Sequence, residues 1–194
     1  MNDKHATRFS RSRRQGLLVY FIPYTKEPGE DTISTRIPLL YSVLKEYAEV
    51  QRAPQLSNTK FFLFNRILLL IKSTRSIFRA LKDREKIIIF GSDQPAGLIA
   101  TVLGTLIKYM QKDRDVRVVY DSHGSRYKLS LDLNPPIIYK VINIFEDSLS
   151  IKMADLIIVP TYADKVIYVQ YTRKKEDLVV LPSLVRTDME YEKT

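Results

Sequence analysis

The chain lacks cysteine entirely and has only two histidines among its 194 residues. Without thiols it has no disulfide, no thiolate metal ligand and no cysteine nucleophile, and this composition suits a reducing compartment. The two histidines, His5 and His123, lie far apart in the sequence, so a histidine-built metal centre is not expected. We therefore expect a protein that has neither a metal site nor a cofactor.

Long apolar runs are missing as well. The aliphatic run from Ile67 to Ile71 is far shorter than the ~20 residues that a membrane-spanning helix requires. The N-terminus is basic but has neither the apolar core nor the small-residue cleavage site of a signal peptide. We therefore expect a cytoplasmic protein whose contact with a membrane, if it makes one, is peripheral and on the inner membrane face.

The glycine-rich and serine-centred fingerprints of several enzyme classes are also absent. The sequence contains no Walker sequence, no G-x-G-x-x-G and no G-x-S-x-G. Nucleotide hydrolases, dinucleotide-binding enzymes and serine hydrolases therefore lose their best support. A small flavodoxin-like domain ranks last among the alternatives, because it too lacks a nucleotide fingerprint.

Positive charge, by contrast, is abundant. The formal net charge is +9 and the isoelectric point is about 9.6. Such an excess indicates the partners of a protein rather than its fold, namely nucleic acid, an anionic membrane surface or phosphorylated small molecules. Residues 1–15 contain four arginines and almost nothing to bury. This predicts a basic flexible arm, either solvated or in contact with phosphates or lipid headgroups.

Residues 16–182 alternate between apolar strands and amphipathic helices. The predicted strands are 17–22, 48–52, 86–90, 116–123, 154–160 and 177–181, and the predicted helices are 31–49, 60–82, 95–111, 137–153 and 162–171. Candidate helix caps are Asp31, Thr32 or Ser34 for the first helix and Ser92 or Asp93 for the third. This alternation predicts one α/β, Rossmann-like domain with a mostly parallel sheet and helices on both faces.

One strand, Val116 to Tyr120, stops abruptly in the polar residues Asp121, Ser122 and His123. In open α/β sheets the ligand binds just beyond the carboxyl ends of the strands. Gly124 follows, and a glycine allows the backbone to approach a ligand closely. The segment therefore predicts a ligand site, although an ordinary polar turn after a strand would have the same sequence.

The predicted helix 60–82 is both basic and aromatic. Phe61, Phe62, Phe64 and Phe78 and several aliphatic residues are interleaved with cations, which are Lys60, Arg66, Lys72, Arg75, Arg79 and Lys82. A helix of this kind can lie on an anionic membrane surface, with these cations facing the lipid headgroups. A helix that packs on the sheet and turns a cationic face to solvent fits the pattern equally well.

Three segments of the second half resemble the N-terminal half of GT-B fold glycosyltransferases, specifically the large retaining family 4. They are the strand that ends in Asp121-Ser122-His123-Gly124, the helix with Glu146 that leads into Ala154–Thr161, and the segment Val179–Glu190. The loop with Pro28-Gly29 lies where that family has its glycine loop.

The resemblance implies a retaining glycosyltransferase that transfers sugar from a nucleotide-sugar donor to a lipid-linked or glycan acceptor. Residues 16–182 would form the acceptor-binding half. Residues 183–194 would be an exit segment toward an absent second domain, which in that family supplies most of the donor site. Three alternatives then stay open: the chain is a fragment, a partner chain carries the donor-binding domain, or the chain no longer catalyses transfer.

The resemblance also implies roles for particular residues. His123 would line the cleft beside the reacting sugar as the catalytic candidate, and its alternative role is to cap the strand end through backbone hydrogen bonds. Arg126 and Lys128 would hold an acceptor phosphate by charge-assisted bonds. The other candidate substrate-binding residues are Gly29, Ser92, Asp121, Ser122 and Gly124.

A function of another class is also compatible with the composition. A non-catalytic basic α/β protein would bind an anionic membrane or, as the less expected partner, nucleic acid. Binding to nucleic acid should fall steeply with salt, whereas a sugar site should depend on His123.

Overall fold

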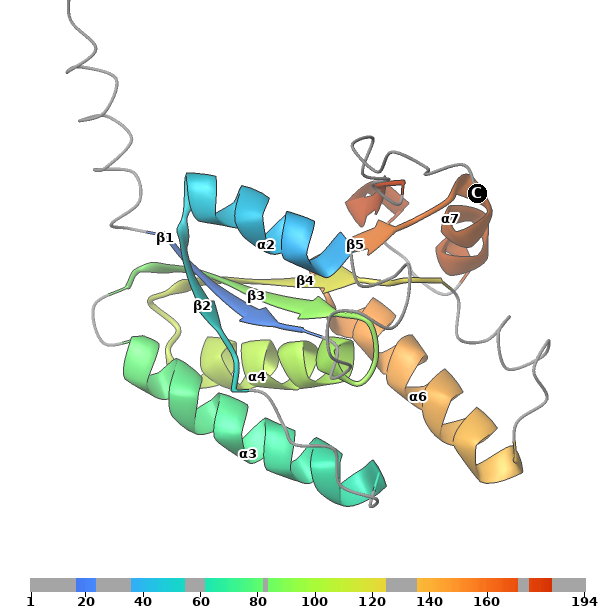
Figure 1. Cartoon of the computed structure of the whole chain (residues 1–194), viewed down its shortest axis with the longest axis horizontal. Coiled ribbons are helices and arrows are strands. Elements are labelled where there is room, and N and C mark those ends of the chain that lie inside the picture. Colours follow the sequence, from blue (N-terminus) through green and yellow to red (C-terminus); the bar gives the residue numbers. More distant parts are fainter. Residues whose placement is uncertain are drawn as a thin grey trace, which may run out of the picture.

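The computed structural model describes residues 17–23, 36–54, 62–81, 84–124, 136–170 and 175–182. Within these residues strands and helices alternate as predicted, and the α/β class is confirmed (Figure 1). The strands are β1 (Leu17–Ile22), β2 (Glu49–Arg52), β3 (Lys86–Ser92), β4 (Asp115–Asp121), β5 (Leu156–Val159) and β6 (Leu178–Val180). The helices are α2 (Arg36–Tyr47), α3 (Phe62–Ala80), α4 (Ala96–Met110), α6 (Ile137–Met153) and α7 (Tyr162–Val169), and the short 3-10 helix η2 (Lys175–Asp177) precedes β6.

The six strands form one sheet in which all neighbouring strands are parallel, in the order β2-β1-β3-β4-β5-β6. The chain adds β2 on one side of β1 and then returns to the other side with β3. One strand therefore lies beyond β1, as in the flavodoxin-like order, whereas the dinucleotide-binding order has two. The reversal places the switch point of this Rossmann-like sheet between β1 and β3, which is where ligands of such sheets bind.

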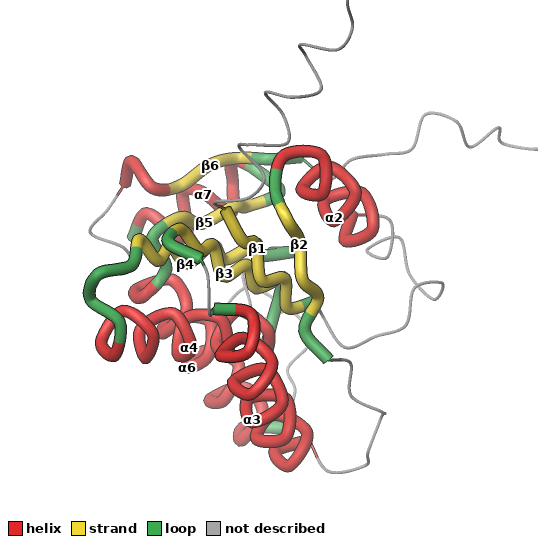
Figure 2. The backbone as a smooth tube through the Cα atoms, turned by 90° about the vertical axis from the view of Figure 1, so that its left-hand side faces the viewer, coloured by secondary structure: helices red, strands yellow, loops and turns green. Residues whose placement is uncertain are grey.

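Both faces of the sheet are covered. Along β1, Tyr20 and Ile22 belong to one buried cluster, and the alternate residues Val19 and Phe21 belong to another. Helices α3, α4 and α6 cover the first face and α2 covers the second (Figures 1 and 2). Because the central strands are covered on both sides, β1 and β3 are continuous apolar runs over most of their length rather than alternating ones.

Helix α4 lies very close to the centre of the sheet, as its small residues predict. A Cβ atom at Gly97 would lie 2.4 Å from the Tyr120 ring, and one at Gly104 would lie 2.1 Å from the Val118 side chain. These distances are below any van der Waals contact. The two glycines therefore set how closely α4 approaches β4.

Most predicted boundaries agree with the structure to within a few residues, and α6 has the predicted bounds. The predicted caps of α4 are wrong. Strand β3 continues through Ser92, Asp93 lies in a turn with φ 58°, and the N-cap of α4 is Pro95, which makes no side-chain cap bond. The predicted caps of α2 and the segments 1–15 and 183–194 lie outside the described residues. Among the described helices, none has the length and apolar character of a membrane span.

Candidate functional site

The carboxyl ends of β3 and β4 lie side by side. Their register pairs Ser92 with Asp121, and the backbone N–H of Asp93 donates to the Asp121 carbonyl at 2.7 Å. On the other side of β4, the N–H of Ser122 donates to the Ile158 carbonyl at 2.8 Å. Two residues that are 29 positions apart in the sequence are thereby brought together at the predicted ligand edge.

Ser92, Asp121 and His123 form one polar cluster, called here the histidine cluster. The Ser92 hydroxyl donates to Asp121 Oδ2 at 3.3 Å, and His123 Nε2 lies 3.0 Å from Ser92 Oγ and 3.3 Å from Asp121 Oδ2. Ser92 and Asp121 are fully buried, whereas the side chain of His123 retains 7% exposure. Of the three side chains, only His123 is therefore accessible from outside the protein, and Ser92 and Asp121 hold its imidazole ring through Nε2.

The geometry of this cluster differs from a Ser-His-Asp catalytic triad. In a triad the carboxylate accepts from Nδ1 while the hydroxyl faces Nε2. Here the hydroxyl and the carboxylate both face Nε2, and Ser92 already donates its proton to Asp121. Both neighbours of Nε2 are therefore acceptors, which assigns the proton to Nε2 and leaves Nδ1 of the neutral ring with a lone pair.

His123 Nδ1 is buried and has no hydrogen-bond partner in the described part of the chain. A buried polar atom without a partner costs about 1–3 kcal/mol, so it calls for an explanation. A hydroxyl group of a ligand would donate to this lone pair and remove that cost. The arrangement is not built to activate Ser92 as a nucleophile.

A second polar network, centred on Asp147 of α6, lies beside the histidine cluster. The Tyr120 hydroxyl donates to Asp147 Oδ1 at 2.8 Å, and the Tyr168 hydroxyl lies 3.2 Å from both oxygens of the same carboxylate. Burial, reinforced by the charge of Asp147, raises the pKa of Tyr120 and of Tyr168 well above the ordinary value of tyrosine. Both phenols therefore keep their protons and act as donors.

The Asp147 network holds the turn after β4. Tyr168 OH lies 2.7 Å from Ser122 Oγ and 3.2 Å from the Gly124 carbonyl, and Ser122 Oγ is 3.1 Å from that carbonyl. Ser122 is fully buried and its hydroxyl is used within the protein, so the structure does not present it to a ligand as predicted. Gly124 has φ +134° with open space around its Cα, so this position requires glycine for backbone conformation alone.

Helix α6 also connects this region to α3. Arg66 of α3 forms a two-bond ion pair with Glu146, with Nε–Oε1 at 2.5 Å and Nη2–Oε2 at 2.8 Å. The two side chains are only 13% and 4% exposed. The prediction that Arg66 faces a membrane is therefore wrong, because its guanidinium is turned inward to a buried carboxylate.

The remaining predicted residues fall into two groups. Lys72, Arg75 and Arg79 are exposed on α3, as a surface role requires. Gly29, Lys60, Arg126 and Lys128 lie outside the described residues.

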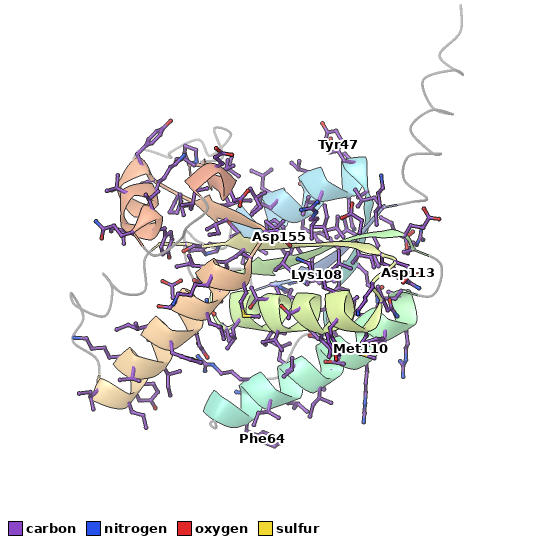
Figure 3. All side chains as sticks on the ribbon, turned by 180° about the vertical axis from the view of Figure 1, so that it is seen from behind. Tyr47, Phe64, Lys108, Met110, Asp113 and Asp155 are labelled. Carbon is purple, nitrogen blue, oxygen red and sulfur yellow. The ribbon has the colours of Figure 1, made fainter. Side chains whose placement is uncertain are left out.

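Asp155, in the segment that resembles family 4, lies at the opposite edge of the sheet from the histidine cluster. Its two carboxylate oxygens accept from Lys108 Nζ at 2.8 and 2.6 Å, and Oδ2 also accepts from the Val118 N–H at 2.7 Å (Figure 3). Asp155 therefore fastens the start of β5 to α4 and β4.

The sequence pattern does not predict the roles of Asp147, Tyr168 and Gln94. The Gln94 amide donates to Ser150 Oγ at 2.8 Å and to the Glu146 carbonyl at 3.3 Å, which joins the turn after β3 to α6. One signal was present, since Glu146 and Asp147 are the only acidic residues of the helix and are adjacent to each other. In the described residues, no three histidine, aspartate or glutamate side chains are grouped as metal ligands would be.

Comparison with known proteins adds no assignment to this site, because no protein-family model and no curated protein matches the sequence.

Proposed function

We propose that this chain is the acceptor-binding half of a retaining glycosyltransferase. It would bind a lipid-linked or glycan acceptor, and a second domain or a partner subunit would bind the nucleotide-sugar donor. The proposal is supported by the resemblance around Asp121-Ser122-His123-Gly124 and by the position of these residues at the carboxyl edge of a parallel sheet.

The observation that carries the proposal is the orientation of His123. Its Nε2 is held by Asp121 and Ser92, and its Nδ1 has no hydrogen-bond partner among the described residues. An imidazole fixed in this way offers one acceptor in a defined direction, which suits a sugar hydroxyl. Glycosyl transfer through an oxocarbenium-like transition state depends on such positioning and on electrostatic stabilisation.

The charges around the site favour a neutral sugar hydroxyl over a phosphate group. Asp93 and Asp121 are buried at this edge, and Asp147 lies buried behind it. The nearby cation Arg66 is paired with Glu146. The described carboxylates would repel a phosphate group in direct contact with them, whereas they would not repel a neutral sugar hydroxyl. The candidates to hold a phosphate of the acceptor are Arg126 and Lys128, which lie outside the described residues.

A binding experiment tests the proposal directly. The purified chain would be titrated with a panel of glycans and polyprenyl-phosphate-linked sugars by calorimetry, beside His123→Ala and the matched control His5→Ala. We expect saturable binding that falls about tenfold in His123→Ala, the loss of one well-placed hydrogen bond, and is unchanged in His5→Ala. Equal binding by the two variants, or binding to no member of the panel, would overturn the proposal.

A transfer assay with mixed nucleotide sugars tests the need for a second domain. We expect no turnover by this chain alone. Turnover that His123→Ala abolishes would make the chain a complete enzyme and contradict the two-domain part of the proposal. Salt-sensitive binding to unrelated nucleic acids, unaffected by His123→Ala, would favour the non-catalytic alternative.

A further inference from the structure

The outer face of α3 carries exposed apolar side chains in its N-terminal half. Phe64, Ile67 and Ile71 follow one another at helical spacing, and Phe64 and Ile67 are 57% and 58% exposed. Phe64 points away from the sheet (Figure 3). Single exposed apolar residues are ordinary, but a continuous stripe of large ones marks an interaction surface.

Helix α6 repeats this arrangement. Ile137, Ile138, Val141 and Phe145 lie on its outer face, and each is between 61% and 80% exposed. The inner face of the same helix is buried and polar in part, with Glu146, Asp147 and Ser150 turned toward the protein. The exposed apolar residues of α6 therefore lie on the outer face of the helix, and packing within the described part of the chain does not account for them.

The two outer faces point to the same side of the molecule. Leu69 and Ile77 of α3 and Ile151 of α6 belong to one core cluster beneath the same face of the sheet. The Arg66–Glu146 ion pair joins the two helices directly. Both helices lie on that side of the sheet (Figure 1), and their exposed residues are on the faces opposite to these buried ones. We use the name α3–α6 surface for the exposed apolar residues of the two helices together with their exposed cations. The apolar residues are Phe64, Ile67, Ile71, Ile137, Ile138, Val141 and Phe145.

The cations follow the apolar residues along each helix. On α3 they are Lys72, Arg75 and Arg79, and on α6 the exposed cation is Lys152. Helix α3 contains no acidic residue, and the two acids of α6, Glu146 and Asp147, are buried. On these two helices, the surface therefore combines apolar residues with cations and presents no exposed carboxylate.

The apolar ends of the helices lie at the edge of the sheet that carries the histidine cluster. Each helix runs back between two parallel strands, so its N-terminus lies near their carboxyl ends. Phe64 and Ile137 are close to the N-termini of their helices. A planar partner that covers the apolar ends would therefore lie beside the carboxyl edge.

We infer that the α3–α6 surface docks on a bilayer of anionic phospholipid. The apolar side chains enter the boundary between headgroups and acyl chains, and the cations contact lipid phosphates. Charge complementarity selects this partner, because a nucleic acid would use the cations but leave seven apolar residues in water. The inference goes beyond sugar transfer and does not depend on it.

Co-sedimentation with vesicles tests the inference. The full chain would be mixed with vesicles of phosphatidylcholine alone or of equimolar phosphatidylcholine and phosphatidylglycerol. We expect binding to the anionic vesicles only. The double variant Ile138→Asn/Val141→Asn should bind at least about tenfold more weakly, and Lys72→Gln/Arg75→Gln/Arg79→Gln about 100-fold more weakly, at about fivefold per cation.

Matched controls separate this surface from general charge and hydrophobicity. Val43→Asn/Val166→Asn removes exposed valines from α2 and α7, and Lys45→Gln/Lys86→Gln/Lys112→Gln removes the same three charges elsewhere. Both should bind as the parent chain does, and thermal unfolding would verify that all variants are folded. Equal binding to neutral vesicles, or equal losses in the controls, would overturn the inference. Binding to a DNA duplex that only the charge variant loses, without vesicle binding, would assign the cations to nucleic acid instead.

Discussion

The two polar groups behind the carboxyl edge, the histidine cluster and the Asp147 network, differ in how completely they are bonded. In the Asp147 network the hydroxyls of Tyr120, Tyr168 and Ser122 all have partners within the protein. In the histidine cluster, Nδ1 of His123 has none among the described residues. A fully bonded buried network stabilises the fold, whereas an unsatisfied buried group costs stability, and in the proposed function that cost is removed when a ligand binds. Stability and ligand binding should therefore respond to different residues, although both groups include residues at the end of β4.

The largest effect is expected from Asp147→Ala. The substitution removes the carboxylate that accepts from the buried Tyr120 hydroxyl and leaves Tyr168 with its bonds to Ser122 and Gly124 alone, so the free energy of unfolding should fall by about 3 kcal/mol. Urea denaturation followed by circular dichroism measures this change. Asp113→Ala, which removes an exposed carboxylate, is the control and should change little (Figure 3). A loss of less than about 1 kcal/mol for Asp147→Ala would show that the network is not a structural support.

An intermediate effect is expected from alkaline pH. The pKa values of Tyr120 and Tyr168 are raised in the folded protein. The stability that the two phenols contribute is therefore fully present below 10.0, the pKa of tyrosine in the unfolded chain. As pH rises above that value, the unfolded tyrosines ionise while the folded ones do not, and stability falls. The slope for each tyrosine is up to about 1.4 kcal/mol per pH unit.

Unfolding measured against pH in the parent chain and in Tyr120→Phe/Tyr168→Phe isolates this contribution. The double variant should lose less stability above pH 10.0 than the parent chain does. Parallel curves would mean that the two phenols are not protected from ionisation, and the contrast between the two groups would then disappear.

The smallest effect on stability is expected from His123→Gln. The change removes a bond to Nε2 but also removes the unsatisfied Nδ1, so the two contributions partly cancel and the free energy of unfolding should change by less than about 1 kcal/mol. The same denaturation experiment measures it. A loss as large as that of Asp147→Ala would make His123 a structural residue and would favour its alternative role as a strand-end cap.

Much of the fold could be predicted because its signals are local. The apolar runs at Leu17–Ile22 and Lys86–Phe90 and the periodic segment Ile137–Met153 each indicate one kind of element, and the structure has these elements at those positions. The close approach of α4 was predictable in the same way, since Gly97 and Gly104 lie seven residues apart and therefore on the same face of the helix.

The partners of buried polar side chains were less predictable. The position of Ser92, a few residues before a proline, predicts a helix cap. In the structure β3 continues through Ser92 and pairs it with Asp121. Arg66 was assigned to a cationic surface because its neighbours along α3 are basic. A carboxylate 80 positions later in the sequence turns it inward, and nothing near Arg66 in the sequence indicates that partner.

The sequence alone determined the order and type of the elements, the excess of positive charge, and the polar residues that end β4, because each depends on neighbouring residues or on composition. Only the tertiary structure decided which strand ends are adjacent, which cations stay exposed, and which nitrogen of His123 has no hydrogen-bond partner among the described residues. It also joined α6 to α3 in one surface. These features depend on contacts between residues tens of positions apart, and such contacts form only when the parallel sheet brings distant segments together.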